Sequence, residues 1–258
     1  MVFARKRFGQ HFLHDPRIIE QIIAAVDARP GQALVEIGPG RGALTEALLA
    51  GAGALDAIEI DRDLVQQLCQ RFGANPGFRL HEADALKFDF AALSAERGAR
   101  LRVVGNLPYN NSTPLLFHLL QSPAAIAELQ IMLQREVIER ITAKPDTSEY
   151  GRLTVMLAPW VDAVKLFDVG PGAFRPPPKV WSAVARLSVR QQPRFAVDQR
   201  FARVVATAFS HRRKTLRNAL KGLIDAATIE RCGIDPSARP ETLTPAQFGE
   251  LAQTLANG

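Results

Sequence analysis

The residues with the clearest chemical potential are Asn106, Leu107, Pro108 and Tyr109, which directly follow the apolar run Leu101–Gly105. A β-branched run that ends at a glycine is typical of a buried strand that stops at a turn. The Asn106 oxygen and a backbone carbonyl can accept the two hydrogens of a planar amine, while Tyr109 stacks on the ring that carries it. Such acceptors would localise the lone pair of the amine for attack on an alkyl donor. A proline-stopped strand with a surface tyrosine is the alternative interpretation.

A second candidate site is the glycine-rich turn at residues 36–42, which closes a predicted strand and opens a predicted helix. Glycines there let the backbone approach a ligand, and the helix N-terminus favours anionic groups. Gly38, Gly40 and Ala43 also satisfy the dinucleotide fingerprint, and Glu59 lies near the position expected for a ribose-binding acid. A nicotinamide dehydrogenase therefore stays open as an alternative. Glu59 is predicted to accept the ribose hydroxyls, against the alternative of a solvated acid at a strand end.

Further polar residues flank these two sites. Asp84 follows the next predicted strand, where its carboxylate could accept the amino group of an adenine, with Glu82 as a close competitor and a helix cap as the alternative. The segment 5–13 mixes cations with aromatic residues and could cover a cofactor cleft or contact RNA phosphates. His11, within that segment, is assigned no proton-transfer role.

The elements that must position these residues alternate between β-rich and helical runs from about residue 32 to residue 190. This alternation predicts an α/β fold with a doubly wound parallel sheet. The predicted strands are Ala33–Ile37, Leu55–Ile60, Phe78–His81, Leu101–Val104, Leu129–Leu133, Ala163–Val169 and Ala183–Val189, and the predicted helices are Ala43–Leu49, Asp63–Arg71, Pro114–Leu120 and Arg135–Ala143. The last two strands lack a crossover helix and are expected to form an antiparallel edge hairpin, joined by an extended proline-rich connection at residues 174–180.

After Val189 the strand pattern ends. Amphipathic helices are predicted at Gln199–Phe209, Lys214–Leu223 and Pro245–Leu255. The sequence therefore predicts a main domain at residues 1–190, whose residues 1–30 form a basic cap segment, and a small C-terminal all-α domain at residues 191–258.

Composition limits the class of protein. The 258 residues are 47% hydrophobic and 22% charged, which is ordinary for a globular chain, and two distant cysteines match no metal spacing. No apolar run suits a membrane span or a signal peptide, so a cytoplasmic protein with no membrane partner and no metal is expected. Of the net charge of +6, the segment Arg186–Lys221 carries ten cations and one acid. This block favours a polyanion-binding face over a merely solvated helix surface.

With these motifs taken in order, the chain resembles the ribosomal RNA adenine dimethylases that use S-adenosylmethionine, from end to end. The matching segments are residues 8–13, 36–40, 59–61, 84–85, 106–110 and 174–180, and residues 212–218 resemble the bacterial small-subunit (kasugamycin-sensitivity type) branch. The resemblance implies a Rossmann-like methyltransferase sheet and S-adenosylmethionine as the cofactor.

The resemblance also implies roles for individual residues. The implied cofactor-binding residues are His11, Leu13, Gly38, Glu59, Asp84 and Asn106; family members usually have Asn where this chain has His11. The implied residues around the target adenine are Asn106, Pro108, Tyr109 and Phe174, with the carbonyl of Pro108 or Leu107 as second acceptor. The implied RNA-binding residues are Arg212, Arg213, Lys214, Arg217 and Lys221.

The reaction that the resemblance implies is dimethylation of the N6 amines of two adjacent adenosines near the 3′ end of small-subunit (16S) ribosomal RNA, within small-subunit biogenesis. The partner would be that RNA or the pre-30S subunit, and the enzyme is expected to be a monomer. Two alternatives remain, a large-subunit adenine dimethylase of the antibiotic-resistance type, and an assembly factor in which binding dominates over catalysis.

Overall fold

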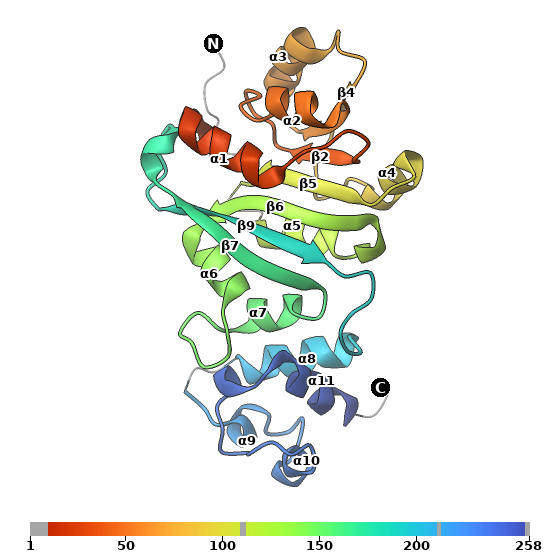
Figure 1. The fold of residues 1–258 in the computed structure, drawn as a ribbon. Helices are drawn as coiled ribbons and strands as arrows, with labels where there is room; N and C mark the ends of the chain where they lie inside the picture. Colours follow the sequence, from red (N-terminus) through yellow and green to blue (C-terminus); the bar gives the residue numbers. More distant parts are fainter. Residues whose placement is uncertain (1–9, 109–111, 211–212, 256–258) are drawn as a thin grey trace. The chain divides into compact units, whose positions relative to one another are not determined.

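The computed structural model describes residues 10–108, 112–210 and 213–255. Its packing divides the chain into two compact units. The first contains Met1–Ile138 and Ala163–Arg190, and the second contains Glu139–Asp162 and Gln191–Gly258. Figure 1 shows the elements of both units along the chain. Among the described residues, no helix combines the length and the apolar character needed to cross a membrane.

The first unit is built on a seven-stranded sheet with the order β4-β3-β2-β5-β6-β9-β7 (Figure 1). The strands from β4 to β6 are parallel to their neighbours, and β9 runs antiparallel to β6. The last two strands of the sheet along the chain, β7 and β9, are hydrogen-bonded neighbours. Strand β9 lies between β6 and β7, so β7 forms the edge of the sheet. The strand bounds are β2 Leu34–Ile37, β3 Leu55–Glu59, β4 Phe78–Glu82, β5 Leu101–Asn106, β6 Ile126–Gln134, β7 Val161–Val169 and β9 Ser182–Val189.

Helices connect the parallel strands, as the alternating pattern requires. Asp15, Asp61 and Asp89 accept backbone N–H bonds at the N-termini of α1, α3 and α4, which satisfies donors that the first helical turn leaves unpaired. Neither α1 nor α4 was predicted from the sequence. The bounds are α1 Pro16–Val26, α2 Thr45–Ala52, α3 Arg62–Phe72, α4 Phe90–Arg97, α5 Ser112–Leu119 and α6 Arg135–Thr142, with short 3-10 turns η2 Pro123–Ala125 and η3 Pro171–Ala173.

The central strand β5 is buried on both faces. Val104 belongs to a core cluster that also contains residues of α1, α2 and α3. Val103 points to the opposite face, because side chains alternate along a strand, and it is equally buried. Because β5 is covered on both faces, a polar side chain is accommodated best at the end of the strand. Asn106 lies at that end.

A separate two-stranded sheet joins the N-terminal segment to the proline-rich connection. In it, β1 Phe12–Leu13 pairs antiparallel with β8 Phe174–Arg175. The His14 N–H continues the pairing by donating to the Ala173 carbonyl at 2.9 Å. This sheet fixes the N-terminal segment at the pocket described below.

The second unit is helical. Its core contains Phe201, Phe248 and Leu216 together with Tyr150 and Val155, so residues 139–162 pack with the C-terminal helices, whereas the sequence analysis placed them in the first domain. Buried Tyr150 explains this grouping, because its hydroxyl donates to the Leu243 carbonyl at 2.7 Å. The bounds are α7 Arg152–Leu157, α8 Gln199–Ala208, α9 Leu216–Ala219, α10 Ala226–Arg231, η4 Pro240–Thr242 and α11 Pro245–Gln253.

The predicted helix Lys214–Leu223 is wrong in length. Only Leu216–Ala219 is α-helical, with Thr215 at its N-cap position. Gly222 adopts a φ of +85°, a left-handed conformation that ends a helix. The helix α10, which is only six residues long, was not predicted either.

Candidate functional site

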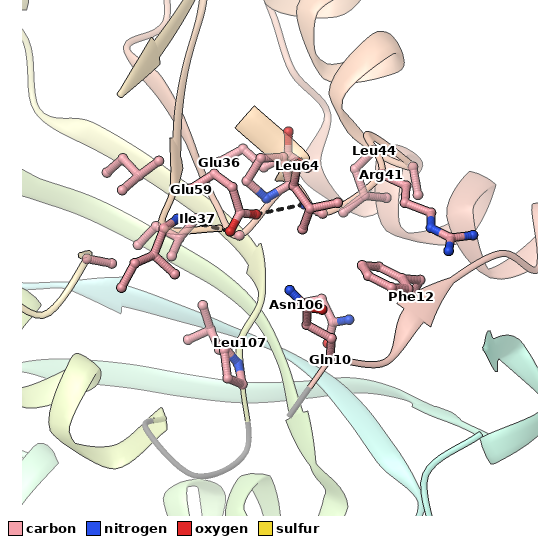
Figure 2. A pocket seen from close by; sticks show the side chains of 18 of the residues that line it. Gln10, Phe12, Glu36, Ile37, Arg41, Leu44, Glu59, Leu64, Asn106 and Leu107 are labelled. Atoms are coloured by element: carbon pink, nitrogen blue, oxygen red, sulfur yellow. Dashed lines mark hydrogen bonds between the residues drawn. The ribbon is translucent and has the colours of Figure 1, made fainter. Parts of the chain in front are cut away.

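A pocket of about 310 Å³ lies at the carboxyl ends of β2, β3, β4 and β5 (Figure 2). The crevice at this edge is where open α/β sheets bind their ligands, and the volume falls within the range of small-molecule sites. The residues that line it include seven of those predicted to bind the cofactor or the target adenine: His11, Leu13, Gly38, Glu59, Asp84, Asn106 and Pro108.

Glu59 ends β3 with a carboxylate that is 6% exposed. Its Oε1 accepts the backbone N–H groups of Ile60 and Asp61, both at 2.9 Å, and its Oε2 accepts that of Gly40 at 3.2 Å. Burial raises the pKa of Glu59, and the three backbone donors act against that rise. The Glu59 carboxylate thus uses three of its roughly four acceptor positions. One ligand hydroxyl can bind at the remaining position, and a second would have to displace the hydrogen bond from Gly40.

The turn after β2 presents backbone to the pocket. Gly38 and Gly40 have φ values of +66° and +59°, which side-chain-bearing residues rarely adopt. A Cβ added at Gly40 would lie 3.2 Å from the Phe12 ring, and the Arg41 guanidinium lies 4.6 Å from the centroid of that ring. Phe12 therefore closes the pocket over the turn, and only glycine permits this approach.

Asp84 lies just beyond β4, and the structure separates it from its competitor Glu82. Asp84 lines the pocket, with Oδ1 accepting the Leu86 N–H at 2.9 Å. Glu82 instead pairs with Arg62 at 2.9 Å on the surface. The second carboxylate oxygen of Asp84 remains available to a donor such as an adenine amino group.

Asn106 ends β5 on the opposite side of the pocket from Glu59 (Figure 2). Its Nδ2 donates to the His11 carbonyl at 3.1 Å, which fixes the amide so that Oδ1 is the atom left to accept an amine hydrogen. The next residue, Leu107, donates its N–H to the Met132 carbonyl at 3.1 Å. Both residues are thus held by backbone partners on neighbouring segments.

The His11 ring forms a hydrogen bond to the proline-rich segment. Its Nδ1 lies 2.8 Å from the Pro176 carbonyl, and because a carbonyl only accepts, this nitrogen carries the proton. The imidazole therefore holds the proline-rich segment, while its main-chain carbonyl holds Asn106. His11, which stands where the resemblance leads us to expect Asn, thus connects the proline-rich segment with Asn106.

Beneath the pocket, Glu36 is 2% exposed and accepts the Thr45 hydroxyl at 2.6 Å. Burial raises the pKa of Glu36 to about 7; the Thr45 bond lowers it and the nearby Glu59 raises it further. The sequence analysis named Glu36 only as the start of the glycine turn. A signal was present, because a carboxylate inside an otherwise apolar buried strand needs a partner.

One of the predicted adenine-binding residues, Phe174, does not line the pocket. Phe174 is 1% exposed and belongs to the apolar core, because β8 points it inward against the sheet. It supports the site from behind and offers no face to a base in this conformation. Tyr109 lies outside the described residues.

The predicted RNA-binding residues lie in the second unit. Arg213, Lys214, Arg217 and Lys221 are all exposed around the short helix α9, and Arg212 lies outside the described residues. Their exposure leaves the guanidinium and ammonium groups accessible to a polyanion.

Some pocket residues were not predicted as site residues. The Gln10 side-chain amide donates a hydrogen bond to the Asp61 carboxylate at 3.0 Å. This bond connects the N-terminal segment with the residues that follow β3. Ile60 lines the pocket and is 46% exposed, which gives a flat ligand an apolar contact. Their only sequence signal was their place beside the recognised motifs.

The residues present fit S-adenosylmethionine. Glu59 and Asp84 supply acceptors for hydroxyl and amino groups, the turn at Gly38 and Gly40 permits close backbone approach, and Ile60 supplies an apolar surface for a base. Among the described residues, no group of three or more His, Cys, Asp or Glu side chains is arranged to hold a metal ion.

The sheet order, with β9 inserted antiparallel beside β6, and the pocket at the carboxyl edge define a Rossmann-like methyltransferase that uses S-adenosylmethionine. A family model described as ribosomal RNA adenine dimethylase matches residues 1–257. The chain belongs to the ribosomal RNA adenine dimethylase family. This membership decides against the nicotinamide dehydrogenase alternative.

Individual relatives agree with this assignment. The ribosomal RNA small subunit methyltransferase A of Pseudomonas aeruginosa is 53% identical over 255 residues, covering 98% of this chain and 95% of that protein. The protein of the same name from Acinetobacter baylyi is 51% identical over 254 residues, covering 98% and 92%. Among solved structures, a dimethyladenosine transferase from Plasmodium falciparum has a TM-score of 0.79 at 25% identity, covering 93% and 96% of the two chains. The 23S rRNA methyltransferase ErmE has a TM-score of 0.74 at 26% identity, covering 95% and 99%.

Proposed function

We propose that this protein transfers methyl groups from S-adenosylmethionine to the N6 amines of two adjacent adenosines near the 3′ end of small-subunit ribosomal RNA, as a step in small-subunit biogenesis. The observation that carries the proposal is the placement of Asn106 and Glu59 on opposite sides of one pocket. One side suits a nucleoside-containing cofactor and the other suits a planar amine. The relatives above 50% identity, named as small-subunit methyltransferases, favour the small subunit as the source of that amine.

The chemical task of Asn106 follows from the target. An exocyclic amine is a poor nucleophile because its lone pair is delocalised into the base. Asn106 Oδ1 accepts one amine hydrogen, and the carbonyl of Leu107 or Pro108 accepts the other, which favours a lone pair localised on nitrogen. After the first transfer one hydrogen remains, so a single acceptor suffices for the second.

The cofactor side of the pocket has a positioning task. When bound, S-adenosylmethionine supplies an electrophilic methyl group, so the protein needs no nucleophilic side chain of its own. Glu59, Asp84, Gly38, Leu13 and the main chain of His11 would hold the donor, and alignment with the amine would provide much of the rate enhancement.

The exposed cations around α9 would bind RNA phosphates in this scheme. Arg213, Lys214, Arg217 and Lys221, with Arg212, supply charge without sequence discrimination, as phosphate contacts do. The target bases must leave their stack to enter the pocket. We further propose that the enzyme acts as a cytoplasmic monomer on the pre-30S subunit.

A large-subunit target is the competing function, and the similarity to the 23S rRNA methyltransferase ErmE is the observation that favours it. Labelled-methyl transfer separates the two. Unmethylated small subunits and mature large subunits are each incubated with the enzyme and labelled cofactor, and the modified nucleoside is identified. We expect N6,N6-dimethyladenosine in small-subunit RNA. Label confined to large subunits would overturn the proposal.

A further inference from the structure

Trp181 is unusual for an aromatic residue of this protein because it is 50% exposed. Within residues 10–108, 112–210 and 213–255, the exposed large apolar side chains are Ile60, Val164, Val180 and Trp181, and Trp181 is the aromatic one. Trp181 does not line the pocket described above, and half of its surface is open to a partner.

The sheet register places Trp181 near the target-base side of the pocket. Trp181 immediately precedes β9, whose first residue, Ser182, pairs with Gln134 at the carboxyl end of β6. Asn106 pairs with Met132, which in turn pairs with Val184. Trp181 is thus two strands away from Asn106 across the sheet and three residues away along β9. At ~4.8 Å per strand and ~3.3 Å per residue, the two Cα atoms are about 14 Å apart.

Arg135 contacts both the main chain and the ring of Trp181. The Arg135 N–H donates to the Trp181 carbonyl at 2.9 Å, and the Arg135 guanidinium lies 5.9 Å from the indole ring centroid. Gly170, which follows β7, lies beside the ring, because a Cβ added there would be 3.7 Å from it. Contacts that limit the motion of a ring lower the entropy cost of binding on its exposed part.

The charge around Trp181 indicates the kind of ligand. Arg135 lies at the ring, and Arg175 and Lys179 are exposed on the proline-rich segment that leads to it. Aromatic rings and arginine planes next to cations are what unstacked RNA bases bind, because each base offers a π-face and each nucleotide a phosphate. Phe174, on the same segment, is buried and cannot serve this purpose.

We propose that Trp181 and Arg135 form a stacking platform for an RNA nucleotide that flanks the target adenosine. The proposal rests on the proposed function, since it assumes that the amine at Asn106 belongs to RNA. A flanking base held there would keep the strand unstacked while the target base occupies the pocket. Trp181 is therefore a positioning residue, and its loss would weaken RNA binding while leaving the chemistry intact.

Steady-state kinetics on unmethylated small subunits provide the first test. Trp181→Ala is expected to raise the KM for subunits roughly tenfold, within the range for loss of one base–aromatic stack, with kcat and cofactor affinity unchanged. Trp181→Phe is expected to restore most of the affinity. Val164→Ala is the matched control, because Val164 is 57% exposed on β7 and lies outside the platform. An unchanged KM in Trp181→Ala would overturn the proposal.

Fluorescence provides a second test that does not depend on catalysis. The chain has two tryptophans, so Trp160→Phe leaves Trp181 as the single reporter. A short single-stranded RNA with two adjacent adenosines is expected to quench it, and replacement of the flanking base by an abasic residue is expected to remove the quenching. If the wild-type enzyme transfers no methyl group to RNA, the proposed function is wrong. The quenching experiment then still tests whether Trp181 stacks on an RNA base. Absence of quenching would show that the ring does not stack on an RNA base and would overturn the proposal.

Discussion

The side chain of Asn106 and the main chain of His11 are joined by a 3.1 Å hydrogen bond. Asn106 ends the central strand β5, whereas His11 lies 95 residues earlier, at the start of the segment that pairs with β8. The same His11 ring binds the Pro176 carbonyl. One short segment therefore sets the orientation of the Asn106 amide and also holds the proline-rich connection.

Asn106→Ala is expected to lower the rate constant of methyl transfer by roughly 10²–10³-fold, the usual loss when one preorganised polar contact to a reacting group is removed. The proposed RNA-binding cations lie elsewhere in the chain, so binding to small subunits should be nearly unchanged. Single-turnover methylation and filter binding measure the two quantities.

Asn106→Asp sharpens the same test, because it keeps an acceptor oxygen while losing the donor to His11. A carboxylate oxygen would then face the His11 carbonyl, and the side chain should turn away. We expect this variant to be nearly as inactive as Asn106→Ala. Equal loss of subunit binding and of methyl transfer in either variant would refute the division of labour between pocket and cations.

Glu59→Gln is expected to weaken cofactor binding roughly 10- to 100-fold, the effect of losing 1.5–3 kcal/mol from charged hydrogen bonds. The amide NH2 would face backbone N–H groups of Gly40 or of Ile60 and Asp61, which donate as well. Calorimetric titration with S-adenosylhomocysteine measures the change. Glu82→Gln is the control at the same edge of the sheet, because Glu82 pairs with Arg62 on the surface. Similar losses in both variants would contradict a specific role for Glu59.

Much of the fold was predictable because the sheet has a strong local signal. Each predicted strand overlaps an observed one, and the five from β2 to β6 are short parallel strands whose apolar runs are bounded by turns. Besides the helices α1, α4, α7 and α10, two features of the tertiary structure escaped prediction. The pairing of β1 with β8 joins two-residue strands far apart in the sequence, and the grouping of residues 139–162 with the second unit depends on tertiary contacts of Tyr150 and Val155. Neither leaves a periodic pattern.

The site was predictable where a residue ends a strand and less so elsewhere. Glu59, Asp84 and Asn106 reach the pocket because parallel strands end at a common edge. Phe174 could not be placed from sequence, because a residue in a two-residue strand faces the core or the pocket according to register alone. The same limit applies to Trp181, whose exposure follows from where β9 begins.

Asp56→Asn is expected to lower the free energy of unfolding by about 3 kcal/mol, the usual cost of breaking a buried ion pair. The Asp56 side chain on β3 is 3% exposed and binds Arg79 at 2.6 Å, His81 at 2.8 Å and Arg97 at 2.6 Å. Burial alone would raise the pKa of Asp56, but these three partners lower it. Urea denaturation measures the change, and Glu96→Gln, at the exposed end of the Arg79 network, should leave stability unchanged. A small effect of Asp56→Asn would show that the cluster is solvated in solution.

Glu36 predicts a loss of stability with rising pH. Its pKa is raised from 4.5 to about 7 in the folded chain, chiefly by burial. Between these two values the folded state binds more protons than the unfolded state, so the free energy of unfolding falls as the pH rises. At 1.36 kcal/mol per pKa unit, the contribution of this group is at most about 3 kcal/mol and is lost by about pH 8.

Glu36→Gln isolates this contribution, because the amide oxygen still accepts the Thr45 hydroxyl and carries no titratable proton. The variant should lose less stability than the wild type between about pH 5 and pH 8, since the groups that do not interact with Glu36 titrate alike in both proteins. Thermal unfolding across that range measures the difference. Glu20→Gln, at an exposed position on α1, is the control and should follow the wild type. Parallel pH profiles for wild type and Glu36→Gln would mean that Glu36 is ionised throughout, and that the buried strand end tolerates its charge through Thr45 alone.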